Sequence, residues 1–300
     1  MILCCGEALI DMLPRDGAGE ACFAPHAGGA VFNTAVALGR LGAPVQFFSG
    51  LSSDLFGTIL QDQLRASGVD SSPAAISDRP TTLAFVTLTG GQASYAFYDE
   101  NTAGRMLTPD DLPATQADAL FFGGISLVVD PCAAAYEALM LREAPRAVTM
   151  IDPNIRPGFI KDESAYRARL TRMLGAADII KISDEDLAWI TGNDDATELR
   201  AQTGAAVVLL TRGADGVSVI TSDAAFDVPA VKATVVDTVG AGDTFSAGFL
   251  ADLQAQGLLR KSAIAGVGRD ALTRATAFGA RVAAITVSRA GANPPWASEL

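Results

Sequence analysis

Short apolar runs alternate with helical segments along this chain, and this alternation restricts the folds that it can adopt. From about residue 118 onward the apolar runs are strand-sized, and the segments between them have the apolar spacing of helices. Apolar strands separated by helices indicate βαβ units around a mainly parallel sheet that is covered on both faces. The predicted strands are 2–5, 45–49, 119–122, 147–151, 178–182 and 205–210, and the clearest predicted helices are 31–41, 55–66, 132–142 and 164–174.

Two regions depart from this α/β pattern. Residues 12–25 have the pattern of strand and turn, and residues 81–98 that of two strands joined by the Gly90-Gly91 turn. Such β segments in an α/β body indicate either a small lid over a pocket or an ordinary edge hairpin, and the sequence leaves both open. No internal repeat or flexible linker is visible. We therefore expect one domain over residues 1–300, with lid strands inserted at about 12–25 and 81–98.

Charge and cysteine content exclude several functional classes. The net charge is −12, from 34 acidic and 22 basic side chains without a basic stripe, which argues against nucleic-acid binding. The longest apolar runs are far shorter than a membrane span, and the N-terminus has the pattern of a buried strand and not of a signal peptide. The four cysteines show no metal-binding spacing and are interpreted as reduced thiols of a cytoplasmic protein. The single histidine, His26, excludes a histidine-rich metal site.

The most informative segment is the run Asp-Thr-Val-Gly-Ala-Gly-Asp at residues 237–243, which precedes a stretch with helical apolar spacing. A glycine-rich turn that enters a helix leaves backbone N–H groups free at the positive end of the helix dipole. Gly240 and Gly242 would allow positive φ angles and close approach of a ligand to the backbone. The segment therefore predicts an anion site.

Asp243 at the end of this run has two interpretations. An acidic helix cap is common, but a bare carboxylate beside an anion site would repel phosphate. A hydroxyl substrate between the carboxylate and the phosphate removes the conflict, since the carboxylate takes the proton while the amides hold the phosphoryl group. The residues favour this catalytic role and leave a plain helix cap as the alternative. The helix dipole is expected to lower the pKa of Asp243.

Other enzyme classes fit the sequence poorly. A dinucleotide oxidoreductase needs Gly-x-Gly-x-x-Gly after its first strand, whereas residues 5–7 read Cys-Gly-Glu. A P-loop nucleotidase needs Gly-Lys-Ser/Thr, which does not occur in the chain. A catalytically silent sugar-binding protein stays open as a remote alternative.

Two segments carry a resemblance to a known family. Residues 237–243 resemble the C-terminal signature of the ribokinase/PfkB family of carbohydrate kinases, and residues 28–42 resemble its N-terminal signature. Within the family the likeness is closest to fructokinases, with the segments 152–156 and 79–82 in support. The resemblance implies a ribokinase-like three-layer α/β/α fold with a small β lid, and transfer of the γ-phosphate of ATP to a sugar hydroxyl. It also implies Mg²⁺, with K⁺ in some members, and a homodimer formed through the lid.

The same resemblance implies three groups of site residues. The catalytic turn would comprise Gly240, Ala241, Gly242 and the base Asp243. The sugar would be bound by Asp11, Gly28, Gly29, Asn33, Phe97, Tyr98 and Arg156. The nucleotide would be bound by Lys181, Ser183, Thr211, Gly213, Gly216, Thr238 and Ala280, and Asp186 would bind the metal ion through water.

Four positions depart from the family pattern. The family's Asn-x-x-Glu motif reads Ser183-x-x-Asp186 here, and Ala280 replaces an asparagine on the adenine side. Many members carry arginine after the lid aromatics, where this chain has Asp99. An aspartate there would repel a sugar acid, so we expect a neutral ketose such as fructose. The alternatives are 2-keto-3-deoxygluconate and another sugar or a nucleoside.

Overall fold

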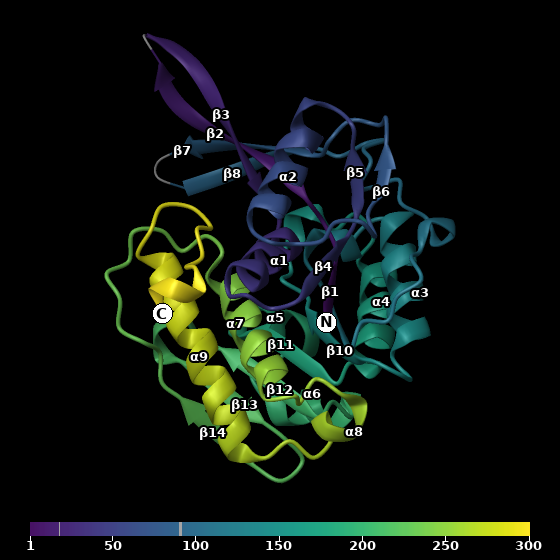
Figure 1. Cartoon of the computed structure of the whole chain (residues 1–300), viewed down its shortest axis with the longest axis vertical. Helices are drawn as coiled ribbons and strands as arrows, with labels where there is room; N and C mark the ends of the chain where they lie inside the picture. Colours follow the sequence, from purple (N-terminus) through teal and green to yellow (C-terminus); the bar gives the residue numbers. More distant parts are fainter. Residues whose placement is uncertain (18, 90–91) are drawn as a thin grey trace.

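The computed structural model describes residues 1–17, 19–89 and 92–300 (Figure 1). In this part of the chain the larger sheet has eight strands in the order β14-β13-β12-β11-β10-β9-β1-β4. The strands from β12 to β4 are parallel, and β13 and β14 are antiparallel additions at one edge. The strands are β1 (Ile2–Cys5), β4 (Val45–Phe48), β9 (Ala119–Gly123), β10 (Val148–Asp152), β11 (Ile179–Ser183), β12 (Val207–Thr211), β13 (Val217–Ile220) and β14 (Ala225–Val228).

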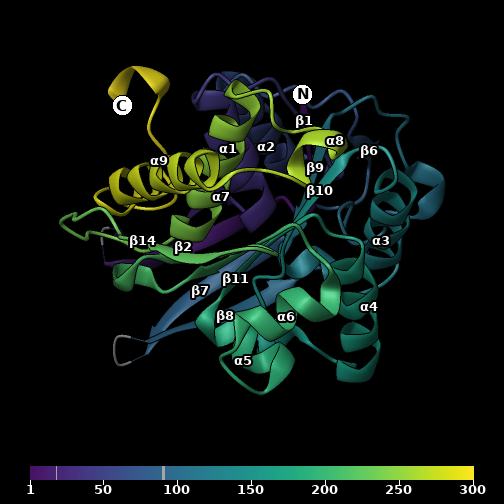
Figure 2. The ribbon, with the colours of Figure 1, turned by 90° about the horizontal axis from the view of Figure 1, so that it is seen from below.

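Helices cover both faces of this sheet, as Figure 2 shows. One face carries α1 (Ala30–Arg40), α2 (Leu55–Ala66), α7 (Ala241–Ala255), α8 (Lys261–Ile264) and α9 (Arg269–Val287). The other carries α3 (Cys132–Glu143), α4 (Glu163–Gly175), α5 (Asp184–Thr191) and α6 (Ala196–Thr203). Short 3-10 helices are η1 (Pro109–Asp111), η2 (Gly124–Leu127), η3 (Pro157–Phe159), η4 (Gly213–Asp215) and η5 (Ala297–Glu299). The predicted three-layer α/β/α arrangement is confirmed.

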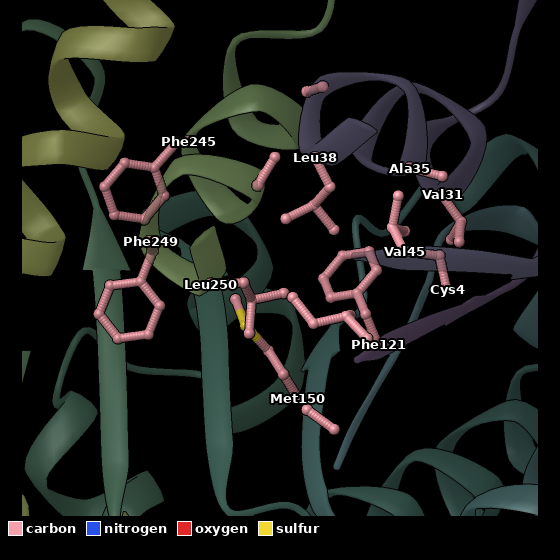
Figure 3. Close-up of a cluster of buried hydrophobic side chains, with 14 of the residues drawn as sticks. Cys4, Val31, Ala35, Leu38, Val45, Phe121, Met150, Phe245, Phe249 and Leu250 are labelled. Atoms are coloured by element: carbon pink, nitrogen blue, oxygen red, sulfur yellow. The ribbon is translucent and has the colours of Figure 1, made fainter. Parts of the chain in front are cut away.

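The parallel strands are buried on both faces, so each supplies side chains to two cores. Cys4 packs with the core on the α1 and α7 side, and its neighbour Cys5 packs with the core on the α3 and α4 side. Figure 3 shows the first of these cores, which combines Phe245 and Phe249 of α7 and Leu38 of α1 with Phe121 of β9. This packing sets the position of α7 relative to α1.

A second sheet projects from the body and forms the predicted lid (Figure 1). Its strands are β2 (Leu9–Gly17), β3 (Glu20–Gly28), β7 (Leu83–Thr89) and β8 (Gln92–Tyr98), in the order β3-β2-β7-β8. β7 and β8 are antiparallel, as the hairpin prediction requires, and the predicted Gly90-Gly91 turn lies outside the described residues. A two-stranded sheet of β5 (Gly50–Ser52) and β6 (Ala75–Ser77) lies beside it.

The fold brings the carboxyl ends of the parallel strands to one edge of the sheet. Glu7 follows β1, Asp152 ends β10, and Ser183 and Thr211 end β11 and β12. This edge is where open α/β sheets bind ligands, so it is the first place to search for a site. Among the described residues, no helix combines the length and apolarity needed to span a membrane.

Candidate active site

The turn before α7 has the geometry of an anion site. Gly240 is the N-cap of α7 with φ 79°, and α7 then runs for 15 residues. A Cβ on Gly240 would lie 2.7 Å from the Ala292 Cβ, so both the φ angle and the packing favour glycine. Asp237 stabilises the turn through two hydrogen bonds. Its Oδ1 accepts one from the Val239 N–H, and its Oδ2 accepts one from the Gly291 N–H.

Gly242 has a different role from the one that the sequence suggested. It lies in the first turn of α7 and is not among the glycines with positive φ. A Cβ on Gly242 would lie 3.1 Å from Nζ of Lys181. Gly242 therefore allows a buried ammonium group to approach the start of α7, where the sequence predicted an anion.

Asp243 faces a partner from the other end of the chain. Its Oδ2 accepts a hydrogen bond from Nδ2 of Asn33 at 2.9 Å, and both side chains are buried. The helix cap is Gly240, so the interpretation of Asp243 as a plain N-cap is wrong. The prediction of a lowered pKa is also wrong, since burial raises the pKa of Asp243 to about 7, against the opposing effect of the Asn33 hydrogen bond. A buried carboxylate with a pKa near neutrality is suited to general-base catalysis.

Lys181 and Asp152 form a buried ion pair next to the turn before α7. Nζ of Lys181 lies 3.0 Å from Oδ2 of Asp152, and both residues are at most 5% exposed. Burial alone would lower the pKa of Lys181, but the carboxylates of Asp152, Asp186 and Asp243 together outweigh it and the pKa is raised. Burial raises the pKa of Asp152, and its Oδ1 has no hydrogen-bond partner among the described residues. Lys181 thus places a positive charge beside Gly242.

Gly28 and Gly29 allow the close approach of two acidic residues. A Cβ on Gly28 would lie 2.3 Å from Oδ2 of Asp11, whose pKa burial raises to about 6. Gly29 has φ 109°, and a Cβ there would lie 2.9 Å from the Glu7 carbonyl oxygen. Oε1 of Glu7 accepts a hydrogen bond at 2.8 Å from the Ala30 N–H, at the start of α1. Sequence reasoning assigned no role to Glu7, although its place directly after the first strand was a usable signal.

The lid presents Phe97 and Tyr98 on opposite faces. Asp11 pairs with Ala84, and Ala84 pairs with Phe97, so Asp11 and Phe97 share one face of the lid. The adjacent Tyr98 lies on the other face, where its ring meets Phe85 at 5.5 Å, and it is 62% exposed. Phe97 contacts Phe159 of the body at 4.3 Å. The structure therefore brings Phe97 toward the Asp11 side and does not bring Tyr98 there.

A cavity of about 640 Å³ adjoins the turn before α7. It gathers Thr211, Gly213, Gly216, Thr238 and Ala280 from the predicted nucleotide group, together with Ala241 and Gly242 of the turn. Sequence reasoning missed the rest of its lining. These residues are Ala214, Val217 and Phe245, together with Ala230, Val231, Lys232, Ala233 and Val235 of the segment after β14 and Ala283, Ala284 and Val287 of α9. Two residues of the predicted nucleotide group, Lys181 and Ser183, do not line the cavity. Nζ of Lys181 lies next to Gly242. The Ser183 hydroxyl caps α5, because it accepts a hydrogen bond from the Asp186 N–H at 3.0 Å.

Arg156 lies in the loop after β10, at the edge of the sheet where the parallel strands have their carboxyl ends. Oδ1 of Asp186 accepts a hydrogen bond from the Ile155 N–H at 3.0 Å. Asp99 is not a lone charge, because its Oδ1 lies 3.1 Å from the Arg105 guanidinium. The expected repulsion of a sugar acid by Asp99 therefore loses its basis.

Comparisons with known proteins define the class of protein to which this chain belongs. The model of the pfkB family of carbohydrate kinases matches residues 1–299, and the chain belongs to this family. It is therefore a carbohydrate kinase. It is 56% identical over 278 residues to a fructokinase from Rhizobium leguminosarum bv. trifolii, covering 91% of this chain and 85% of that protein.

Solved structures agree with this assignment. A fructokinase from Xylella fastidiosa with bound ATP has a TM-score of 0.90 and 32% identity, covering 97% of this chain and 93% of that one. A fructokinase from Vibrio cholerae, bound to fructose, ADP and a calcium ion, has a TM-score of 0.82 and 26% identity, covering 97% and 94%. These likenesses confirm the ribokinase-like fold and the resemblance to fructokinases.

Proposed function

We propose that this kinase, a single domain over residues 1–300, transfers the γ-phosphate of ATP to a hydroxyl of fructose. The observation that carries the proposal is the buried Asp243 carboxylate, which is hydrogen-bonded to Asn33 and directly follows Ala241 and Gly242, two lining residues of the 640 Å³ cavity. An alcohol on the Asn33 side and a nucleotide on the cavity side would meet at the turn. The similarity to fructokinases supports fructose as the alcohol.

In the proposed mechanism the chain's residues position both reactants. Asp11, Gly28, Gly29, Asn33, Phe97 and Arg156 bind the sugar, and Asp243 accepts the proton of the attacking hydroxyl. The N–H groups of Ala241, Gly242 and Asp243 hold the phosphoryl group, with the Lys181 ammonium behind them. Because the amides and the ammonium are already oriented, little reorganisation is needed as charge develops.

We propose a divalent cation, Mg²⁺, as the partner of the nucleotide phosphates. The residues fit a hydrated cation. Oδ1 of Asp152 is buried without a hydrogen-bond partner in the part of the chain that the structure describes, and Asp186 adds a second carboxylate whose charge acts on Asp152. The cation would neutralise phosphate charge. A K⁺ ion near the Asp237 loop is proposed from the family resemblance. The four free cysteines support a cytoplasmic location.

The experiment is an ADP-release assay with ATP and a panel of neutral ketoses, aldoses, sugar acids and nucleosides. We expect the highest kcat/KM with fructose. A preference for 2-keto-3-deoxygluconate or a nucleoside would contradict the substrate, and absence of transfer to every alcohol would contradict the kinase.

The pKa of Asp243 predicts how the rate depends on pH. The base must be ionised, so kcat/KM should fall as the pH drops below about 7, where the carboxyl becomes protonated. Asn33→Ala removes the hydrogen bond that lowers this pKa, so the acidic limb should move to higher pH. Thr34→Ala is the control, since the Thr34 hydroxyl donates to the backbone carbonyls of Ala30 and Asp243 and not to the Asp243 carboxylate. Identical profiles for all three proteins would contradict Asp243 as the titrating base.

The cavity lining predicts a tolerant phosphate donor site. Among its described lining residues, the polar side chains are Thr211, Lys232 and Thr238, and the α9 wall is Ala280, Ala283, Ala284 and Val287. Apolar walls reject a wrong base weakly, so kcat/KM for ATP and GTP should agree within about tenfold. Ala280→Asn should favour ATP, because an amide matches the N6/N7 edge of adenine. Ala280→Leu, similar in volume, is the control, and an equal effect of both variants would contradict this reasoning.

We propose that a second copy of the chain covers the outer lid face, formed by Met12, Phe23, Leu83, Phe85 and Tyr98. Phe23 and Tyr98 are exposed at 39% and 62%, and both rings contact Phe85. Phe23→Glu with Tyr98→Glu should therefore convert a dimer into a monomer in sedimentation velocity. Leu141→Glu, at an exposed position on α3, should leave the mass unchanged. A wild-type monomer would contradict the dimer.

A further inference from the structure

Asp186 has a contact that a metal-binding role does not require. The residue lies in the first turn of α5 and is only 5% exposed. Its Oδ1 accepts a hydrogen bond at 3.0 Å from the Ile155 N–H, which lies in the loop after β10. Ile155 is itself 5% exposed, so water does not readily replace this bond. One carboxylate oxygen of Asp186 therefore fixes the loop backbone.

The backbone beside this hydrogen bond has an unusual conformation. Asn154, the residue before Ile155, has φ 45°, a left-handed conformation that non-glycine residues adopt rarely. Such a conformation persists when surrounding contacts hold it. The hydrogen bond from Ile155 to Asp186 is a contact of this kind, directly adjacent to the unusual residue.

Arg156 follows Ile155 and depends on the same backbone. Its Nη1 donates to the Ile155 carbonyl oxygen at 3.0 Å, and no salt bridge of Arg156 occurs among the described residues. Its charge acts on Asp152 at the end of β10, so the guanidinium lies near the ion pair next to the turn. The position of Arg156 is thus set by the loop and not by an acidic side chain.

We propose that Asp186 is a positioning residue that holds Arg156 toward the transferring phosphoryl group by binding the backbone of Ile155. This inference rests on the proposed kinase function. It gives Asp186 a role in which the oxygen acceptor matters more than the negative charge. In a role limited to the metal ion, the charge would matter most.

The two roles predict different results for two substitutions. Asp186→Asn keeps a carbonyl oxygen as acceptor, whereas Asp186→Ala removes it. We expect Asp186→Ala to lower kcat by about 10- to 100-fold, the scale of one lost buried hydrogen bond. Asp186→Asn, which loses the charge and keeps the acceptor, should lower kcat at least about tenfold less than Asp186→Ala. Asp184→Ala is the matched control, since Asp184 is an exposed acid in the same turn of α5.

Arg156→Ala tests whether Asp186 acts through Arg156. In the Arg156→Ala background, Asp186→Ala should lower kcat by no more than about twofold further, because the group that it positions is gone. Hydrogen exchange gives a readout independent of activity: the Ile155 amide should exchange faster in Asp186→Ala and at the wild-type rate in Asp186→Asn. Thermal unfolding identifies a variant that fails to fold.

Three outcomes would overturn the proposal. Equal losses of kcat in Asp186→Asn and Asp186→Ala, with a raised Mg²⁺ requirement in both, would assign Asp186 to the metal ion alone. Fully additive effects of Asp186→Ala and Arg156→Ala would separate the two residues. Unchanged exchange of the Ile155 amide in Asp186→Ala would show that the hydrogen bond does not hold the loop. Failure of the wild-type protein to phosphorylate any alcohol would instead refute the proposed function.

Discussion

Asp243→Asn is expected to lower kcat by about 10²–10⁴, the scale of a lost general base. The substitution keeps the size of the side chain and removes the ability to accept a proton from the sugar hydroxyl. The Asn33 amide can still hydrogen-bond to the new carbonyl oxygen, so the site should keep its geometry. Nucleotide affinity should change little, because the amides of the turn are unaffected.

Steady-state kinetics and nucleotide binding by calorimetry check this prediction. Asp252→Asn is the matched control, because Asp252 is a buried carboxylate on the same helix that pairs with Arg274 at 3.0 Å, away from the turn. We expect this control to lose stability and to keep its kcat. Near-normal turnover of Asp243→Asn would remove Asp243 as the base and leave the role of the turn to its amides.

Much of the fold could be predicted because its signals are local. The predicted helix 55–66 matches α2, and the predicted strand 2–5 matches β1. β13 and β14 were missed because a polar residue, Ser218 or Asp227, interrupts each apolar run, whereas the four residues of β1 are all apolar. The site turn was also predictable, since its glycines and the helix that follows are contiguous in the sequence.

What could not be predicted depends on residues far apart in the chain. The pKa of Asp243 has the opposite sign to the prediction because burial outweighs the helix dipole, and burial is a property of the packed molecule. The ion pair of Asp99 with Arg105 depends on how the loop after β8 folds back. The separation of Phe97 and Tyr98 depends on strand register, because a shift of one residue would exchange their faces.

Lys181→Met is expected to destabilise the fold by about 3–5 kcal/mol, because it leaves the Asp152 carboxylate buried and without its cation. Urea unfolding of the wild type and the variant measures this loss. Asp152→Asn added to Lys181→Met should restore most of the stability, since no uncompensated charge then remains. An unfolding free energy of Lys181→Met within about 1 kcal/mol of wild type would contradict a tightly coupled buried pair.

The pH dependence and the turnover of these variants separate the structural role of the pair from its catalytic role. Burial raises the pKa of Asp152 and Lys181 lowers it, so removing Lys181 should raise it further. A carboxyl whose folded-state pKa exceeds its unfolded value loses stability as the pH rises, so the deficit of Lys181→Met should be larger at pH 8 than at pH 5. The double variant should fold well at both pH values and remain slow, because the ammonium beside Gly242 and the Asp152 carboxylate proposed to face the metal ion are both absent. A stable double variant with full turnover would confine the pair to folding, whereas a stable and slow one would show that the Lys181–Asp152 pair serves phosphoryl transfer.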